Sequence, residues 1–360
     1  MNLSAAKAIV DAMTFKERFS RTAPAIAARL GPKATARISN PIQYRGGPMS
    51  CPDPDVFAWG PLYVATGTSD IGQYNPLPNG TMGPAPAAFP IYWSRDLATW
   101  YFANYIVPNG HGPPGTNPPT GSWKFSGRYW APEIHSIGGE YVAYFGAQKT
   151  NGKMGIFVAW TKHLFGGNWQ SKILIDTDGS IDPSVWWIGS QLHMVYTHQP
   201  NSVWLTKLSA DGLTAQGKGV QISEGNLPWE KDTKGHYVEE GPVLWTYKDA
   251  NGKWTTYCFF NAASTWDPTY AIGVLIQQPN GSWKKHPEPI LSAGPELVST
   301  GLGTQPFRTA SGKLFISFHC QFRQSCGHHM EERWLCFAPL EMASGIPTVG
   351  GGVPPTAVVT

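Results

Sequence analysis

The chain has 360 residues, of which 14% are charged and 13% are aromatic, and its net charge is +3. Soluble domains usually carry roughly 25% charged residues, and the few lysines and arginines here are scattered, which excludes a strongly basic surface for nucleic acid or an anionic membrane. No run approaches the roughly 18 apolar residues of a transmembrane helix. We therefore expect neither nucleic acid nor a membrane as a partner.

The first 40 residues are predicted to form an N-terminal extension. In "MNLSAAKAIVDAMTFKERF" the apolar residues recur at helical spacing after Asn2 or Ser4, either of which can cap a helix. The segment lacks the continuous apolar stretch of a signal peptide, and a cleaved leader that is absent from this sequence is the alternative. We expect a helix that packs on the main domain.

A short apolar phrase recurs five times along the rest of the chain. Its copies are LYVATGT (62–68), EYVAYFG (140–146), QLHMVYT (191–197), TTYCFFN (255–261) and KLFISFH (313–319). Each follows a turn signal, and before each turn lies another short strand that contains DPDVF, APEIH, DPSVWW, EGPVLW or TQPFR. A β-sandwich would explain the turns but not the repetition of the phrase.

Five units of strand, tight turn and strand, with no helical period between them, predict an all-β fold, a five-bladed β-propeller. We place it at residues 41–345 and expect a C-terminal tail at 346–360. The Gly/Pro-rich segment 109–122 is expected to be a long loop on one rim, where binding specificity usually resides.

Acidic or amide residues stand near a proline at the start of each predicted first strand. They are Asp53, Glu133, Asp182, Glu240 and Gln305. Because proline cannot donate to a strand ladder, it marks the start of a strand, which places these side chains at the mouth of the central channel. No Arg or Lys stands next to the acids in the sequence, so a functional cluster is favoured over structural ion pairs. The many aromatic residues suit a sugar-binding surface, with an aromatic core as the alternative.

Glu239 and Glu240 are neighbours on one predicted strand. Successive side chains of a strand point to opposite faces, so the two carboxylates cannot share an environment. We expect Glu240 to face the channel and Glu239 to face solvent.

At these motifs the sequence resembles glycoside hydrolase family 43, over about residues 48 to 343. The matching phrases are DPDVF (53–57), WSRDLATW (93–100), YWAPEI (129–134), IDPSVWW (181–187), VWLTKLSADG (203–212) and EGPVL (240–244). Their order and spacing are more specific than any one of them. The resemblance implies a five-bladed propeller and an inverting hydrolase that acts on arabinose- or xylose-containing glycans.

The resemblance also implies roles for the three acids. Asp53 becomes the general base, Glu240 the general acid, and Asp182 an ionised carboxylate that raises the pKa of Glu240 by repulsion. Such a pair suits inversion, in which an acid protonates the leaving oxygen and a base activates water on the opposite face. Trp130 is predicted to stack on the sugar, with a core tryptophan as the alternative.

The remaining predictions concern ligands and substrate. Glu133 and Gln305 are predicted to bind substrate. Many family members hold a calcium or other ion in the channel with a fifth-blade histidine, but GLGTQPF (301–307) has Thr304 or Gln305 there. We therefore expect no required metal or cofactor, and a structural calcium or sodium ion is the alternative.

The substrate class follows from the resemblance and from the long loop, which could wall off one side of the cleft. We expect an exo-acting α-L-arabinofuranosidase for arabinan- or arabinoxylan-type glycans, monomeric, and secreted by analogy with the family. A β-xylosidase, an endo-arabinanase and a non-catalytic carbohydrate-binding propeller are the alternatives. A retaining fructan-acting enzyme is disfavoured, because no Arg-Asp-Pro triplet occurs.

Overall fold

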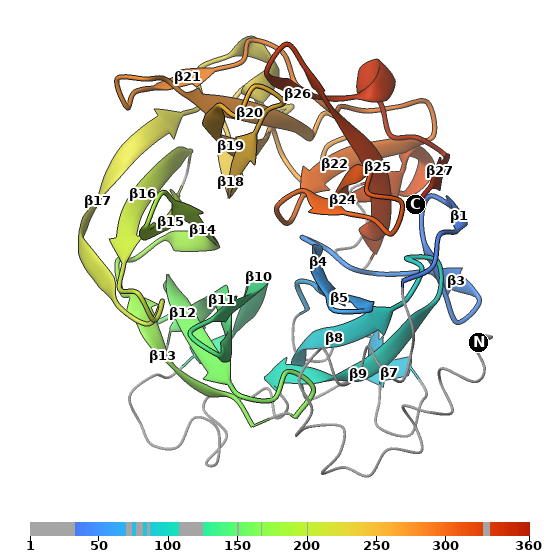
Figure 1. Cartoon of the computed structure of the whole chain (residues 1–360), viewed down its shortest axis with the longest axis horizontal. Helices are drawn as coiled ribbons and strands as arrows, with labels where there is room; N and C mark the ends of the chain where they lie inside the picture. Colours follow the sequence, from blue (N-terminus) through green and yellow to red (C-terminus); the bar gives the residue numbers. More distant parts are fainter. Residues whose placement is uncertain are drawn as a thin grey trace.

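The computed structural model describes residues 33–69, 74–76, 82–84, 87–107, 125–149, 151–166, 168–199, 201–326 and 332–360. Five antiparallel sheets follow one another around a central axis, so the predicted five-bladed β-propeller is confirmed (Figure 1). The expected N-terminal helix (within 1–32) and the rim loop 109–122 lie outside the described residues. No helix in the described part of the chain is long and apolar enough to span a bilayer.

Each blade is built from one continuous stretch of chain. Blade 1 contains β4 (Asp55–Trp59), β5 (Leu62–Thr66), β8 (Ala88–Ser94) and β9 (Trp100–Val107). Blade 2 contains β10 (Phe125–Ile137), β11 (Glu140–Lys149), β12 (Met154–Thr161) and β13 (Gln170–Ile175). Blade 3 contains β14 (Ser180–Ile188), β15 (Gln191–His198), β16 (Ser202–Leu208) and β17 (Ala215–Glu224).

The last two blades complete the ring. Blade 4 contains β18 (Glu239–Lys248), β19 (Trp254–Ala262), β20 (Ala271–Gln277) and β21 (Trp283–Lys285). Blade 5 contains β22 (Leu297–Leu302), β23 (Phe307–Arg308), β24 (Leu314–Phe322), β25 (Trp334–Ala343) and β26 (Ile346–Val349). The five recurring phrases all fall on the second of the long strands of a blade, as the repeat predicts.

Blade 5 departs from the predicted pattern at its inner edge. Both β22 and β23 pair with β24, at its two ends, so the innermost line of the blade is interrupted between residues 302 and 307. The phrase TQPFR supplies only the short β23. Gln305 lies in the interruption, beside Pro306, which cannot donate to the ladder.

The ends of the chain close the ring between blades 5 and 1. β1 (Arg37–Ser39) pairs with β27 (Ala357–Val359), and the segment before blade 1 follows β25, where the Ile42 amide donates to the Leu335 carbonyl at 2.8 Å. β26 is also part of blade 5. The predicted boundary at residue 345 is therefore too early, because the expected tail contributes strands to the fold.

The inner strands share one backbone irregularity at the channel mouth. In four blades the residue before a proline has a positive φ: Asp53 (49°), Ala131 (44°), Asp182 (52°) and Gly241 (54°). In blades 2 to 4 the pairing register also shifts at this point. Such bulges bend a strand and change the direction of its side chains, so residues on the two sides of the proline reach different depths of the ring.

Candidate active site

A pocket of about 240 Å³ opens at the mouth of the ring. Its lining includes Asp53, Trp130, Asp182, Glu240, Tyr270 and Arg333. The structure therefore brings the three acids with predicted catalytic roles together, from blades 1, 3 and 4, although they are far apart in the sequence. All three are half-buried.

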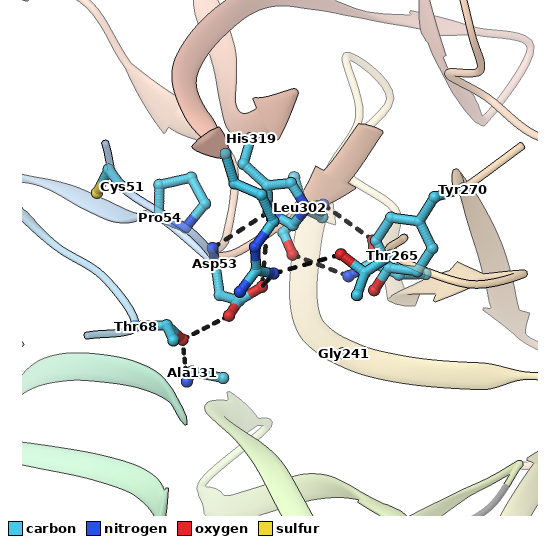
Figure 2. A network of polar contacts seen from close by, with 12 residues as sticks. Cys51, Asp53, Pro54, Thr68, Ala131, Gly241, Thr265, Tyr270, Leu302 and His319 are labelled. Carbon is cyan, nitrogen blue, oxygen red and sulfur yellow. Dashed lines mark hydrogen bonds and ion pairs between the residues drawn. The ribbon is translucent and has the colours of Figure 1, made fainter. Parts of the chain in front are cut away.

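Asp53 is held as a carboxylate at one side of this pocket. Thr68 donates its hydroxyl to Asp53 Oδ2 at 2.5 Å and accepts the Ala131 amide at 2.7 Å, as Figure 2 shows. Arg333 Nη1 lies 2.9 Å from Asp53 Oδ1. Burial alone would raise the pKa of Asp53, but the Arg333 guanidinium and the Thr68 hydrogen bond outweigh it and hold the pKa below its ordinary value.

His319 supports the backbone of Asp53 rather than its charge. Its Nδ1 accepts the Asp53 amide at 3.1 Å, which helps to hold the left-handed backbone at this residue (Figure 2). Burial and the neighbouring Arg333 lower the pKa of His319 to about 3, so the ring is neutral at physiological pH. Arg333 and the Thr68 hydroxyl, rather than a charged His319, therefore keep the pKa of Asp53 low.

Glu240 has the opposite electrostatic environment. The Tyr270 hydroxyl donates to Glu240 Oε1 at 2.9 Å. Burial, with the Asp53 charge acting in the same direction, raises the pKa of Glu240 to about 7, against the effects of Tyr270 and Arg333. Near neutral pH this carboxyl is thus able to keep a proton while Asp53 has lost its own.

Asp182 lies next to Glu240. Its Oδ2 accepts the Gly241 amide at 3.1 Å and the Thr197 hydroxyl at 3.3 Å. Burial, then Glu240 and Asp53, raise the pKa of Asp182 well above its ordinary value. This differs from the expectation that Asp182 stays ionised, because burial and the two neighbouring carboxyls disfavour its charged form.

Trp130 lies in the pocket wall and is half-buried, with the Arg128 guanidinium 5.6 Å from the centre of its ring. Its indole N–H is buried and has no hydrogen-bond partner among the described residues. A wall position fits the predicted stacking role, and the orphan N–H gives a hydroxyl-bearing ligand a donor to bind.

Glu133 and Gln305 do not line this pocket, contrary to their predicted role. Both are buried, and the Gln305 amide donates to Glu133 and, at 3.0 Å, to the Ser184 hydroxyl. Glu133 also accepts from His135 at 2.7 Å and from the Val185 amide at 3.1 Å. They form a channel network that joins blades 2, 3 and 5.

Asp55 belongs to the same channel network. Its Oδ2 accepts the Ile134 amide at 2.7 Å. Burial, with the Glu133 charge acting in the same direction, raises the pKa of Asp55 to about 7. The sequence motif DPDVF thus supplies one aspartate to each layer, Asp53 to the pocket and Asp55 to the channel.

The channel residues do not fit a cation. The Gln305 amide nitrogen points at the Glu133 carboxylate, so a donor occupies the place where an ion would need an acceptor, and both Glu133 oxygens already accept hydrogen bonds. Among the described residues no cluster of three or more His, Cys, Asp or Glu side chains could hold a metal. No step of the proposed reaction uses an ion there.

Glu239 is buried, so the expectation that it faces solvent is wrong. Lys285 Nζ lies 2.9 Å from Glu239 Oε2 and 2.7 Å from Glu230 Oε1, and both carboxylates are fully buried. Burial, which outweighs Lys285, raises the pKa of Glu239 to about 7. Strand alternation does turn Glu239 away from the pocket, but an inner strand of a propeller has a neighbouring blade on each side and no face in solvent.

Several pocket residues could not be predicted from the sequence. Arg333 pairs with Asp53 from a position 280 residues away, and Tyr270 reaches Glu240 from the loop before β20. Trp266, 44% exposed, also lines the pocket. No local motif marks these residues, because the closure of the ring brings them to the site.

A model of the glycosyl hydrolases family 43 matches residues 38–347. The chain belongs to this family. One relative is an extracellular exo-α-(1→5)-L-arabinofuranosidase of Streptomyces avermitilis, 27% identical over 197 residues that cover 49% of this chain and 39% of the relative. This chain therefore spans less than two thirds of that relative's length.

Solved structures of family 43 share the fold. A thermostable family-43 glycoside hydrolase matches with a TM-score of 0.68 at 20% identity, covering 89% of this chain and 96% of the other. A xylan β-1,4-xylosidase of Bacillus halodurans matches with a TM-score of 0.66 at 18% identity, covering 89% of this chain and 59% of the other. At these identities the likeness concerns the fold alone.

Proposed function

We propose that the protein is an inverting glycoside hydrolase that removes terminal α-L-arabinofuranosyl residues from arabinan- or arabinoxylan-type polysaccharides and oligosaccharides. The observation that carries the proposal is that one pocket holds a carboxyl that favours the ionised form, Asp53, and a carboxyl that favours the protonated form, Glu240. Arg333 keeps the pKa of Asp53 low, whereas burial raises the pKa of Glu240 to about 7. Acid–base hydrolysis of a glycoside needs one carboxyl of each kind.

In the proposed reaction Glu240 gives its proton to the glycosidic oxygen as the bond from that oxygen to the anomeric carbon breaks. Asp53 takes a proton from a water molecule whose oxygen bonds to the same carbon from the opposite face. The products are a sugar of inverted configuration and the shortened glycan, with Asp53 protonated and Glu240 ionised. Exchange of one proton with solvent restores the starting state.

Two observations support a terminal pentose as the substrate. The pocket, at about 240 Å³, is below the roughly 300–1,000 Å³ of sites for drug-sized ligands, which suits one small sugar residue. The Streptomyces avermitilis relative is an exo-acting arabinofuranosidase and extracellular, which supports the same activity and secretion for this protein.

The test is the release of sugar from arabinan, arabinoxylan and the nitrophenyl derivatives of α-L-arabinofuranose and β-D-xylopyranose. We expect arabinose as the main product, in the β configuration when first formed, as followed by NMR. Xylose alone would indicate a β-xylosidase, and internal oligosaccharides an endo-arabinanase. Binding without release of any sugar would contradict the proposal and favour a carbohydrate-binding propeller.

A further inference from the structure

A second pocket, of about 400 Å³, lies between blades 2 and 3, which are neighbours in the ring (Figure 1). One wall is formed by residues 174–177, at the end of β13, and the others by residues of β15, β16 and β17. Its volume is within the roughly 300–1,000 Å³ that small-molecule sites occupy. None of the predicted site residues lines it.

An irregularity in β17 opens the floor of this pocket. The β16–β17 pairing passes from Leu205 opposite Val220 to Lys207 opposite Gln216, so residues 217–219 stand unpaired opposite Thr206. Thr206 is only 4% exposed and lines the pocket, and its hydroxyl has no hydrogen-bond partner in the part of the chain that the structure describes. A buried hydroxyl without a partner is costly, so a ligand that bonds to it here gains an interaction the protein leaves open.

Aromatic side chains form one wall. Tyr196 and Trp204 are directly opposite each other on β15 and β16, and such pairs share a face of the sheet. The Trp204 indole N–H donates to the Ser202 hydroxyl at 3.0 Å, which fixes the ring. His198 meets Trp204 edge-on, with ring centroids 5.8 Å apart. Its Nδ1 is a second buried atom that has no partner within the described ranges.

The charges around the pocket favour a neutral ligand. Asp176 and Lys218 both line the pocket, and their charges are opposite, so neither sign dominates the lining. Lys149 Nζ also lies 2.7 Å from the Asp176 carboxylate and 2.6 Å from that of Asp178, which compensates the acidic charge at this wall. The pocket thus combines the fixed ring of Trp204 with polar groups that can bind a ligand. This combination suits a sugar, because the apolar face of a sugar ring stacks on an aromatic ring while its hydroxyls form hydrogen bonds.

This pocket adjoins the active-site pocket along β15. Thr197 donates to Asp182, His198 lines the second pocket, and Gln199 lines the active-site pocket. Consecutive Cα atoms are about 3.8 Å apart. Residues of the two pockets are therefore neighbours at the end of β15, within reach of one polysaccharide chain.

We propose that the pocket between blades 2 and 3 is a second sugar-binding site, which holds a neutral residue of the same polysaccharide from which the terminal residue is cleaved. The choice of polysaccharide rests on the proposed function, but binding at this site needs no catalysis. Its effect is to keep the polymer near the active site and so raise its effective concentration.

The test compares Trp204→Ala and Thr206→Val with wild type and with Trp254→Ala, which removes a tryptophan that is 64% exposed and outside both pockets. Native gel electrophoresis through arabinan or arabinoxylan measures binding of the full chain. We expect Thr206→Val, which keeps the shape of the side chain, to raise the dissociation constant about fivefold, the factor for one hydrogen bond. Trp204→Ala should raise it more, and Trp254→Ala should leave it unchanged.

Kinetics separate this site from the active site. In Trp204→Ala and Thr206→Val, KM should rise for the polymer. It should stay constant for the nitrophenyl arabinoside, which occupies only the active-site pocket. If wild type fails to bind either polymer, or if both variants are folded and bind as wild type does, the inference is overturned. An equal rise of KM for both substrates would also overturn it. If the polymer in the gel slows the protein and the effect depends on Trp204, but no sugar is released, the second binding site is upheld and the proposed function is contradicted.

Discussion

The candidate active-site pocket and the channel network each gather carboxylates from several blades, yet their environments differ. In the pocket, Asp53 and Glu240 are half-buried and face an open space of about 240 Å³. In the channel, both oxygens of Glu133 accept hydrogen bonds, and the residue is only 1% exposed. Convergence of acids at the axis of a propeller is therefore not by itself a sign of catalysis.

In blades 1 to 4 the proline of the inner strand separates the two layers. Asp53 and Asp182 directly precede a proline and reach the pocket, whereas Asp55 and Glu133 directly follow one and reach the channel. The positive φ before the proline turns the strand between these positions. Position relative to the proline thus decides whether an acid meets substrate or protein.

The largest expected effect is a loss of kcat when an acid of the pocket is replaced by its amide. Glu240→Gln and Asp53→Asn should lower kcat by about 10²–10⁴-fold, the usual contribution of a general acid or base, with little change in melting temperature. Glu288→Gln, at an exposed carboxylate outside the pocket, is the matched control. Turnover near that of wild type in either variant would refute the catalytic assignment.

In the channel the same isosteric change should act on stability instead. Glu133→Gln puts an amide N–H₂ where the carboxylate accepts hydrogen bonds from His135, Gln305 and the Val185 amide. We expect a loss of about 1–3 kcal/mol in the free energy of unfolding, the cost of an unsatisfied buried group, measured by urea denaturation. A large fall in kcat with unchanged stability would contradict this structural role and indicate that Glu133 acts in catalysis.

A smaller effect is expected at the pocket wall. If Trp130 stacks on the sugar, Trp130→Ala should raise KM several-fold, in keeping with the modest energy of one aromatic contact, and lower the melting temperature little. Trp266→Ala, at the other exposed aromatic of the wall, provides a comparison at the same pocket. Loss of stability with an unchanged KM would assign Trp130 to the core between blades.

The smallest effect concerns pH. Glu240 acts while protonated, so activity is present below its pKa of about 7 and lost as pH rises through that value. Asp53 acts while ionised, and because its pKa is lowered, the acidic limb lies at low pH. As pH rises, the repulsion between Glu240 and Asp182 opposes ionisation of both carboxyls. Removing this repulsion by Asp182→Asn should therefore lower the pKa of Glu240 and move the alkaline limb of kcat/KM to lower pH.

The acidic limb serves as the internal control for that experiment. Asp53 is paired with Arg333, so Asp182→Asn should move this limb less than the alkaline one. The limbs report apparent pKa values of the coupled acids, and only their relative displacement is diagnostic. An alkaline limb that stays in place or moves upward would mean that Asp182 does not tune Glu240 by its charge.

Local patterns in the sequence determine most of the architecture. The five apolar phrases and their turns predict five blades, because pairing of neighbouring strands across a tight turn needs only nearby residues. The prolines near Asp53, Asp182 and Glu240 mark where inner strands begin, and the structure does gather these acids in one pocket. Strand alternation also places the side chains of Glu239 and Glu240 on opposite faces of their strand.

Tertiary structure alone decides what each acid contacts. Arg333 reaches Asp53 only because the segment before β25 closes against blade 1. Lys285, at the end of the outermost strand of blade 4, reaches Glu239 at the start of the innermost strand only in the folded blade. The split of blade 5 likewise places Gln305 in the channel. Charge and burial at a site depend on such distant partners, so the pKa values that distinguish Asp53 from Glu240 appear only once the ring is closed.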